Sequence, residues 1–180
     1  TGAVGLGGLL VEAGRQHKRL TSSALSFVLA PRIDAAGRLG RAELAAELVL
    51  THDPVRAQSL AGQLCEQNKL RQNEENQILT QALIRLRKEY NPLEDKIIVL
   101  AGKGWHHGVI GIVCSRLCDR YGCPVVLISL DEDGTGKGSG RSIKGLNLFA
   151  ALSSCSDLLE RYGGHELAAG RPVAPDRSPL

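Results

Sequence analysis

The sequence predicts an α/β protein in which a helical segment and a long linker helix precede a small α/β domain. Three observations predict this class. Helical periodicity fills the first third of the chain, and a helical stretch without a break then follows Pro54. Short apolar runs alternate with a helical pattern after Pro92, which is typical of a parallel β-α-β unit within a mixed sheet.

The first third is expected to form short helices over residues 4–13, 22–29 and 41–50. Thr and Ser residues precede the second helix and favour its start, while regularly spaced leucines and alanines indicate the third. Pro31 is expected to end the second helix and to open a polar turn, PRIDAAGRLGR.

A long helix is expected to begin at Asp53-Pro54, an N-cap followed by proline, and to end before Asn91-Pro92. Its length would be on the order of 55 Å. Apolar residues cluster at its two ends, whereas the middle, RQNEENQ (71–77), is polar on every face. Such a helix usually crosses solvent between two packed bodies; a bundle helix with a hydrated middle is the alternative.

The last part of the chain alternates between strands and helices. Strands are expected over 97–101 and 124–130, with a helix between them over 109–121 that Gly122 closes. The turn DEDGTGKG then leads to a strand over 139–143, a helix over 147–162 and an edge strand over 170–173. We therefore divide the chain into residues 1–52, 53–92 and 93–180.

Composition narrows the function classes. Aromatic residues make up only 3% of the chain, so base stacking on an aromatic platform is not the expected mode of nucleic-acid binding. The net charge of +3 is mild, and no apolar run is long enough to span a membrane. The five cysteines are odd in number, irregularly spaced and in apolar surroundings, so we expect reduced, buried thiols rather than disulfides. Zinc binding by Cys114, Cys118 and Cys123 with a nearby histidine is not expected, because the spacing lacks a close Cys-x-x-Cys pair. The glycine-rich start without Met indicates a fragment.

The stretch RYGGHELAAG (161–170) has more glycine than a helix end requires. We expect one glycine of the pair Gly163 and Gly164 to end the helix, and the other to let a ligand approach the main chain. His165 would then donate a hydrogen bond to a phosphate oxygen. A helix-ending turn with a histidine satisfied by the core is the alternative.

Two further stretches are candidates for anion binding. Arg141 and Ser142 follow the turn DEDGTGKG, where the guanidinium could hold a phosphate while the serine donates a second hydrogen bond. The loop GKGWHHGVIG (102–111) joins a strand to a helix start, whose free N–H groups favour an anion. His106 and His107 would either cap that helix or contact the anion.

The segment PRIDAAGRLG (31–40) brings Arg32, Asp34 and Arg38 within one loop. It is interpreted either as an anion grip at a domain edge or as a turn held by Arg/Asp pairing. A metal-dependent nuclease needs several Asp or His ligands that converge on an ion, and the sequence contains no such cluster.

Taken in order, PRIDAAGRLG, the long helix, GWHHGVIGIVCSRLCDRYGCPVVLISL, GSGRS and YGGHELAAG resemble the bacterial RecJ family of single-strand-specific exonucleases, in the DHH phosphoesterase superfamily. The resemblance covers nearly the whole chain. Two departures stand out: Asp34 replaces the usual Asn of the family's PRxNAxGR segment, and Tyr162 replaces the third glycine of the GGH signature.

The resemblance implies a domain assignment. Residues 1–52 would be the C-terminal helical part of the DHH catalytic domain, 53–92 the linker helix, and 93–180 the DHH-associated, substrate-binding domain. The Asp and His ligands of Mn²⁺ or Mg²⁺ would lie in a part of the full-length enzyme that this chain lacks.

It also implies roles for single residues. His165 and Arg141 would be the catalytic residues, and Arg32, Arg38, His106, Ser142, Gly163 and Gly164 would bind the DNA backbone. No metal ligand is expected within this chain.

The function implied by the resemblance is metal-dependent 5′ to 3′ digestion of single-stranded DNA in repair and recombination, in the cytoplasm. A single-strand-binding protein or other repair proteins would be its partners. This chain would hold the strand weakly and in a salt-sensitive way, without cutting it. Two alternatives stay open: a phosphodiesterase for nanoRNA or cyclic dinucleotides, and a non-catalytic relative that acts as a nucleic-acid-binding scaffold.

Overall fold

The structure is a computed structural model that describes residues 4–16, 19, 21–156 and 163–173. The chain divides into two compact units, residues 1–73 and 74–180, and each is described by itself. The boundary between the units falls inside one long helix, α5 (Pro54–Glu89). The ends of α5 lie close to those expected for the long helix from the sequence. No helix in the described ranges is long and apolar enough to cross a membrane.

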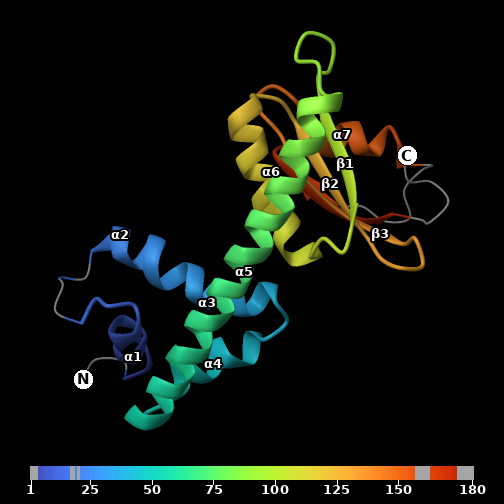
Figure 1. The fold of residues 1–180 in the computed structure, drawn as a ribbon. Helices are drawn as coiled ribbons and strands as arrows, with labels where there is room; N and C mark the ends of the chain where they lie inside the picture. Colours follow the sequence, from blue (N-terminus) through green and yellow to red (C-terminus); the bar gives the residue numbers. More distant parts are fainter. Residues whose placement is uncertain (1–3, 17–18, 20, 157–162, 174–180) are drawn as a thin grey trace. The chain divides into compact units, whose positions relative to one another are not determined.

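The first unit is helical (Figure 1). The elements that precede α5 are α1 (Val4–Glu12), α2 (Ser22–Ala24), the π-helical segment η1 (Leu25–Leu29), α3 (Ala30–Arg38) and α4 (Ala42–Leu50). The expected polar turn after Pro31 is wrong, because α3 continues the preceding helix through this proline. The π-helical segment ends two residues before Pro31, where regular α-helical geometry would make the proline ring clash with the carbonyl group four residues earlier.

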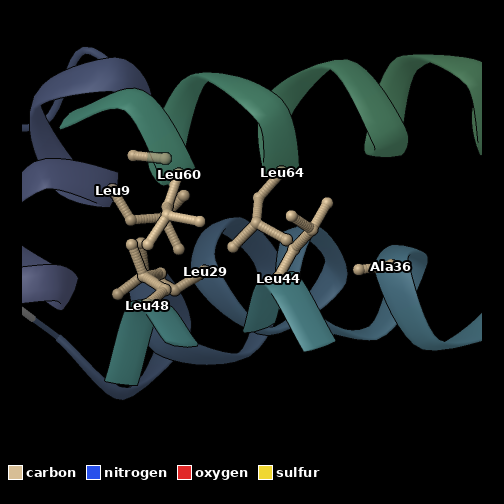
Figure 2. Close-up of a cluster of buried hydrophobic side chains, with 8 residues drawn as sticks. Leu9, Leu29, Ala36, Leu44, Leu48, Leu60 and Leu64 are labelled. Atoms are coloured by element: carbon tan, nitrogen blue, oxygen red, sulfur yellow. The ribbon is translucent and has the colours of Figure 1, made fainter. Parts of the chain in front are cut away.

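The core of the first unit is made of leucine and alanine side chains from four helical segments and from the first half of α5. Figure 2 shows these side chains meeting between the helices. The buried members of this cluster are Leu9, Leu29, Ala36, Leu44, Leu48, Leu60, Ala61 and Leu64. The apolar positions that indicated helices in the sequence are thus also the positions at which the helices contact one another.

The second unit contains a five-stranded sheet in the order β1-β2-β3-β5-β4. The elements after α5 are β1 (Ile98–Lys103), α6 (His107–Tyr121), β2 (Val125–Leu130), β3 (Gly136–Arg141), α7 (Leu148–Ser153), β4 (Gly163–His165) and β5 (Ala168–Val173). Strands β1 and β2 are parallel and the other pairs are antiparallel, so the predicted mixed sheet with a β-α-β unit is confirmed. Gly122 closes α6 with a φ of 64°, as expected.

Helices α6 and α7 cover opposite faces of the sheet (Figure 1). A Cβ added at Gly111 of α6 would lie 2.9 Å from Oγ of Ser139 on β3. A Cβ added at Gly140 would instead lie 2.8 Å from Leu148 of α7. Because neighbouring residues of a strand point to opposite faces, Ser139 and Arg141 share the α6 face.

Two predicted elements of this unit are wrong. The helix expected over 147–162 ends at Ser153, where Ser153 and Ser154 hydroxyls donate to backbone carbonyls and compete with the helix; residues 157–162 lie outside the described ranges. The strand expected at the sheet edge, 170–173, belongs to β5, which lies between β3 and β4. The edge strand is β4, which begins at Gly163. The expectation that one glycine of this pair ends a helix concerns residues 157–162 and lies outside the described ranges.

The expectation that the middle of α5 lies in solvent on every face is wrong at Glu75. This side chain belongs to the second unit and is only 9% exposed. Its Oε1 accepts a hydrogen bond from Nη1 of Arg116 on α6 at 2.8 Å. The sequence around Glu75 is polar and suggested exposure to solvent. The ion pair with Arg116 on α6 instead allows the Glu75 carboxylate to be buried.

The five cysteines are free, as expected, and three of them are buried. Burial raises the pKa of the Cys114 thiol to about 12, and its Sγ donates to the carbonyl oxygen of Ser139 at 2.9 Å. Cys155 is exposed, so the expected burial is wrong for this residue. The described ranges contain no group of three or more His, Cys, Asp or Glu side chains that could hold a metal ion.

Candidate nucleic-acid interface

The candidate site in the second unit is a row of residues that crosses the sheet from β3 to β4. Arg141 on β3 pairs with Ala168 on β5, and His165 on β4 pairs with the same Ala168. Directly paired residues have side chains on the same face, so Arg141 and His165 both project from the α6 face. Their Cα atoms are about 10 Å apart, because two strand spacings separate them.

His165 lies on the exposed edge strand. Its Nδ1 accepts a hydrogen bond from the backbone N–H of Leu167 at 3.3 Å. In the neutral ring this bond places the proton on Nε2, which makes Nε2 a hydrogen-bond donor. The imidazole is therefore not enclosed by the core, and the alternative of a core histidine is wrong.

The guanidinium of Arg141 lies against α6. Its Nη1 donates to the carbonyl oxygen of Gly140 at 2.7 Å, and its Nη2 lies 3.4 Å from the position that a Cβ of Gly111 would take. Because Gly111 has no side chain, the guanidinium of Arg141 has free space next to it on the α6 side. Ala168, between Arg141 and His165, contributes only a methyl group to the surface that separates them.

The two glycines of the edge strand differ in their surroundings. No described residue lies within 4 Å of a Cβ built at Gly163, and ligand binding at its main chain stays a prediction. A Cβ at Gly164 would lie 2.4 Å from the carbonyl oxygen of Ala168. Gly164 is therefore required by the close approach of β4 and β5, and its contact with a ligand stays a prediction.

Ser142 is the residue expected to bind a phosphate together with Arg141. Its Oγ donates to the carbonyl oxygen of Leu146 at 2.9 Å, which holds the turn that follows β3. The hydroxyl proton is used within the turn in this structure, and a second hydrogen bond donated by Ser142 to a phosphate stays a prediction. Ser139 is the serine that shares the α6 face with Arg141, as does Lys137 by strand alternation. The alternation in KGSGR was the signal that could have identified both.

His106 caps helix α6. Its Nδ1 accepts a hydrogen bond from the backbone N–H of Gly108 at 3.1 Å, and its ring stacks on that of His107 with 5.2 Å between centroids. Desolvation, assisted by the nearby Lys137, lowers the pKa of His107 below its ordinary value. The capping alternative stated for these two residues therefore describes His106, and its contact with a substrate stays a prediction.

The two arginines of PRIDAAGRLG lie in the first unit, on α3, and have different partners. Nε of Arg38 pairs with Oδ2 of Asp34 one helical turn away at 2.5 Å. Arg32 donates from Nη1 to the carbonyl oxygen of Val28 at 2.6 Å, and from Nε to Sγ of Cys65 at 3.3 Å. The Arg/Asp pairing alternative is thus present, but within a helix rather than a turn.

Arg32 also lines a cavity of about 750 Å³ that lies within the first unit. Arg15, Lys69 and Arg71 line the same cavity, together with Glu12. Sequence reasoning missed these cations because they come from distant parts of the chain. Arg38 follows Arg32 by six positions, which places the two on different faces of α3, and Arg38 is absent from the cavity lining.

Comparison with known proteins assigns the chain to a family. Residues 94–177 match the DHHA1 domain. The chain is 37% identical over 180 residues to the single-stranded-DNA-specific exonuclease RecJ of Bacillus subtilis. That alignment covers 99% of this chain and 23% of the Bacillus protein. It is 44% identical over 146 residues to RecJ of Thermus thermophilus, in an alignment that covers 81% of this chain and 20% of the Thermus protein.

Solved structures agree with these matches. RecJ from Thermus thermophilus in complex with Mg²⁺ aligns with a TM-score of 0.85 and 38% identity, over 97% of this chain and 26% of that chain. A manganese-bound exonuclease RecJ aligns with a TM-score of 0.81 and 40% identity, over 96% of this chain and 41% of that chain. The chain spans from 20% to 32% of the length of the curated relatives. It therefore belongs to the RecJ family, with a DHHA1 domain over residues 94–177.

Proposed function

We propose that this chain is the strand-holding part of a single-stranded-DNA-specific exonuclease, and that Arg141 and His165 hold the DNA backbone. The observation that carries the proposal is the row from Arg141 through Ala168 to His165 on one face of the sheet. A guanidinium matches phosphate oxygens with parallel hydrogen bonds, and the Nε2–H of His165 adds a donor. The small residue between them lets a sugar-phosphate chain lie flat on the strands.

The surroundings of this row favour backbone recognition over base recognition. Among the described residues, none fills the space beside Gly163, which leaves room for a phosphate to approach the main chain there. Aromatic residues are scarce in the whole sequence, which makes stacking a minor source of affinity. Binding should therefore tolerate any base sequence and weaken as salt rises.

In this proposal the full-length protein uses Mn²⁺ or Mg²⁺, since the names of solved relatives include these ions. The described residues of this chain do not fit such an ion, because no three ligating side chains converge. The ion would activate water in another part of the enzyme, and this chain alone should not cut DNA. Residues 1–52, 53–92 and 93–180 keep the roles proposed above, and cytoplasmic DNA repair and recombination are the proposed setting.

The test uses the full-length enzyme with Arg141→Ala and His165→Ala, and Lys103→Ala as the matched control. Lys103 is an exposed cation at the end of β1 and lies on the opposite face from Arg141 by strand alternation. Each site variant should lose roughly tenfold or more in kcat/KM on a long single strand while its unfolding curve stays unchanged. Wild-type turnover in both site variants would remove these residues from the site.

A substrate panel separates the alternative activity. Long single-stranded DNA, short RNA oligonucleotides and a cyclic dinucleotide would be compared at equal enzyme concentration. Preference for the long strand supports the proposal, whereas preference for the short RNA or the cyclic dinucleotide would favour the small-substrate phosphodiesterase. If the full-length protein binds the long strand but cleaves none of the three substrates, the non-catalytic scaffold would be favoured.

A further inference from the structure

We propose a second anion-binding site in the helical unit, at the cavity lined by Arg15, Arg32, Lys69 and Arg71, with a phosphate-bearing ligand as its occupant. This cavity site lies within residues 1–73 and shares no residue with the row on the sheet. Its volume of about 750 Å³ is within the range of ligand pockets.

The charges around the cavity favour an anion. Four of its described lining residues are cationic, and Glu12 is the acidic member of that lining. The carboxylate of Glu12 accepts a hydrogen bond from the amide of Gln58, so it already has a polar partner. A concave surface lined by one sign of charge concentrates the field and draws the opposite charge.

The two guanidinium groups are held in place by their own unit. Arg32 donates to the carbonyl oxygen of Val28 and to Sγ of Cys65. Arg71 donates from Nη2 to Oδ1 of Asn68 at 2.9 Å, and Asn68 is only 5% exposed. Groups that are already oriented lose less conformational entropy when they bind a ligand, so these contacts prepare the cavity for binding.

The residue types indicate phosphate rather than a single carboxylate. Arginine presents parallel N–H donors that match the oxygens of a phosphate, and the cavity has two such groups held in place. Lys69 adds a point charge; its Nζ lies 3.6 Å from Oε2 of Glu66 on the exposed surface, a contact that water weakens. A doubly charged ligand would therefore bind better than a singly charged one.

The test measures binding of inorganic pyrophosphate to the 180-residue chain by titration calorimetry at low salt. Arg15→Gln and Lys69→Gln should each weaken binding by roughly tenfold. Arg41→Gln is the matched control, since Arg41 pairs with Glu43 in the same unit and is absent from the cavity lining. Urea unfolding of each variant would show that the fold is kept.

A competition arm identifies the source of the phosphate. Displacement of pyrophosphate by an unlabelled oligothymidylate indicates a nucleic-acid strand as the ligand, and lack of displacement indicates a small phosphate compound; both support the site. Each titration is repeated in a chain that also carries Arg141→Ala and His165→Ala, which removes the row on the sheet; losses from Arg15→Gln and Lys69→Gln that persist there separate this site from the proposed function. No binding by the wild-type chain, or equal losses in Arg41→Gln and Lys69→Gln, would overturn the inference.

Discussion

Gly111 of helix α6 provides the sharpest test of how the site is positioned. Its missing side chain leaves the space into which Ser139 and Arg141 project from β3. In Gly111→Ala the new Cβ would lie 2.9 Å from Oγ of Ser139 and 3.4 Å from Nη2 of Arg141. The first distance forces the hydroxyl to move, and the second leaves the guanidinium little room to accommodate that movement.

The magnitude follows from two opposing effects. Replacing glycine by alanine inside a helix stabilises it by about 1 kcal/mol. The overlap involves the end of a short side chain that can rotate, since Cβ of Ser139 is 3.8 Å away, so its cost should be similar. The free energy of unfolding is therefore expected to change by less than about 1 kcal/mol, while displacement of the guanidinium weakens strand binding roughly tenfold.

The assay combines urea unfolding with fluorescence anisotropy of a labelled single-stranded oligonucleotide. Gly62→Ala in α5 is the matched control, because a Cβ there meets nothing within 4 Å; it should stabilise the chain without changing affinity. The double variant Gly111→Ala/Ser139→Ala removes the displaced hydroxyl and should recover part of the affinity. Wild-type binding by Gly111→Ala, in a chain where Arg141→Ala binds weakly, would refute the positioning role.

Three further predictions concern stability, each measured by urea unfolding. Gly164→Ala should cost about 1–3 kcal/mol because its Cβ would overlap the facing strand, whereas Gly163→Ala should be close to neutral; equal effects would contradict this packing. Because burial lowers the pKa of His107, the folded state prefers the neutral ring, so its contribution is present above the ordinary value of 6.5 and declines below it; His107→Gln should remove that part of the pH dependence, and an unchanged pH profile would disprove it. Glu75→Gln should cost about 1–2 kcal/mol, since the Arg116 side chain is 48% exposed and regains water; a neutral result would show that the ion pair contributes nothing.

Some features of the fold could be predicted because their causes lie within a few residues of the chain. Proline at the start of α5, the αL glycine that ends α6 and the apolar runs of β1 and β2 are local signals. The parallel pairing followed from the helix between the two strands, which leaves little choice of topology. Arg141 and His165 could be proposed from their motifs, but their motifs did not reveal that one sheet row contains both.

Other features depended on contacts between distant segments. Pairing of β5 with both β3 and β4 placed it inside the sheet, and that pairing explains why Gly164 must lack a side chain. A helix packed on β3 decided that Ser139 rather than Ser142 accompanies Arg141. An arginine from another helix buried Glu75, although its neighbours in sequence are polar.

Most described elements of this protein could thus be predicted from the order of amino acids alone, and the same order suggested several candidate anion-binding residues. Which of those residues share a surface depended on the folded chain, because strand order and helix placement set the direction of each side chain. Folding also brought four cations of the first unit to one cavity from segments that no local pattern connects. Local propensity depends on residues that are close in sequence, whereas a binding surface is formed by residues that are distant in sequence and meet only in the folded protein.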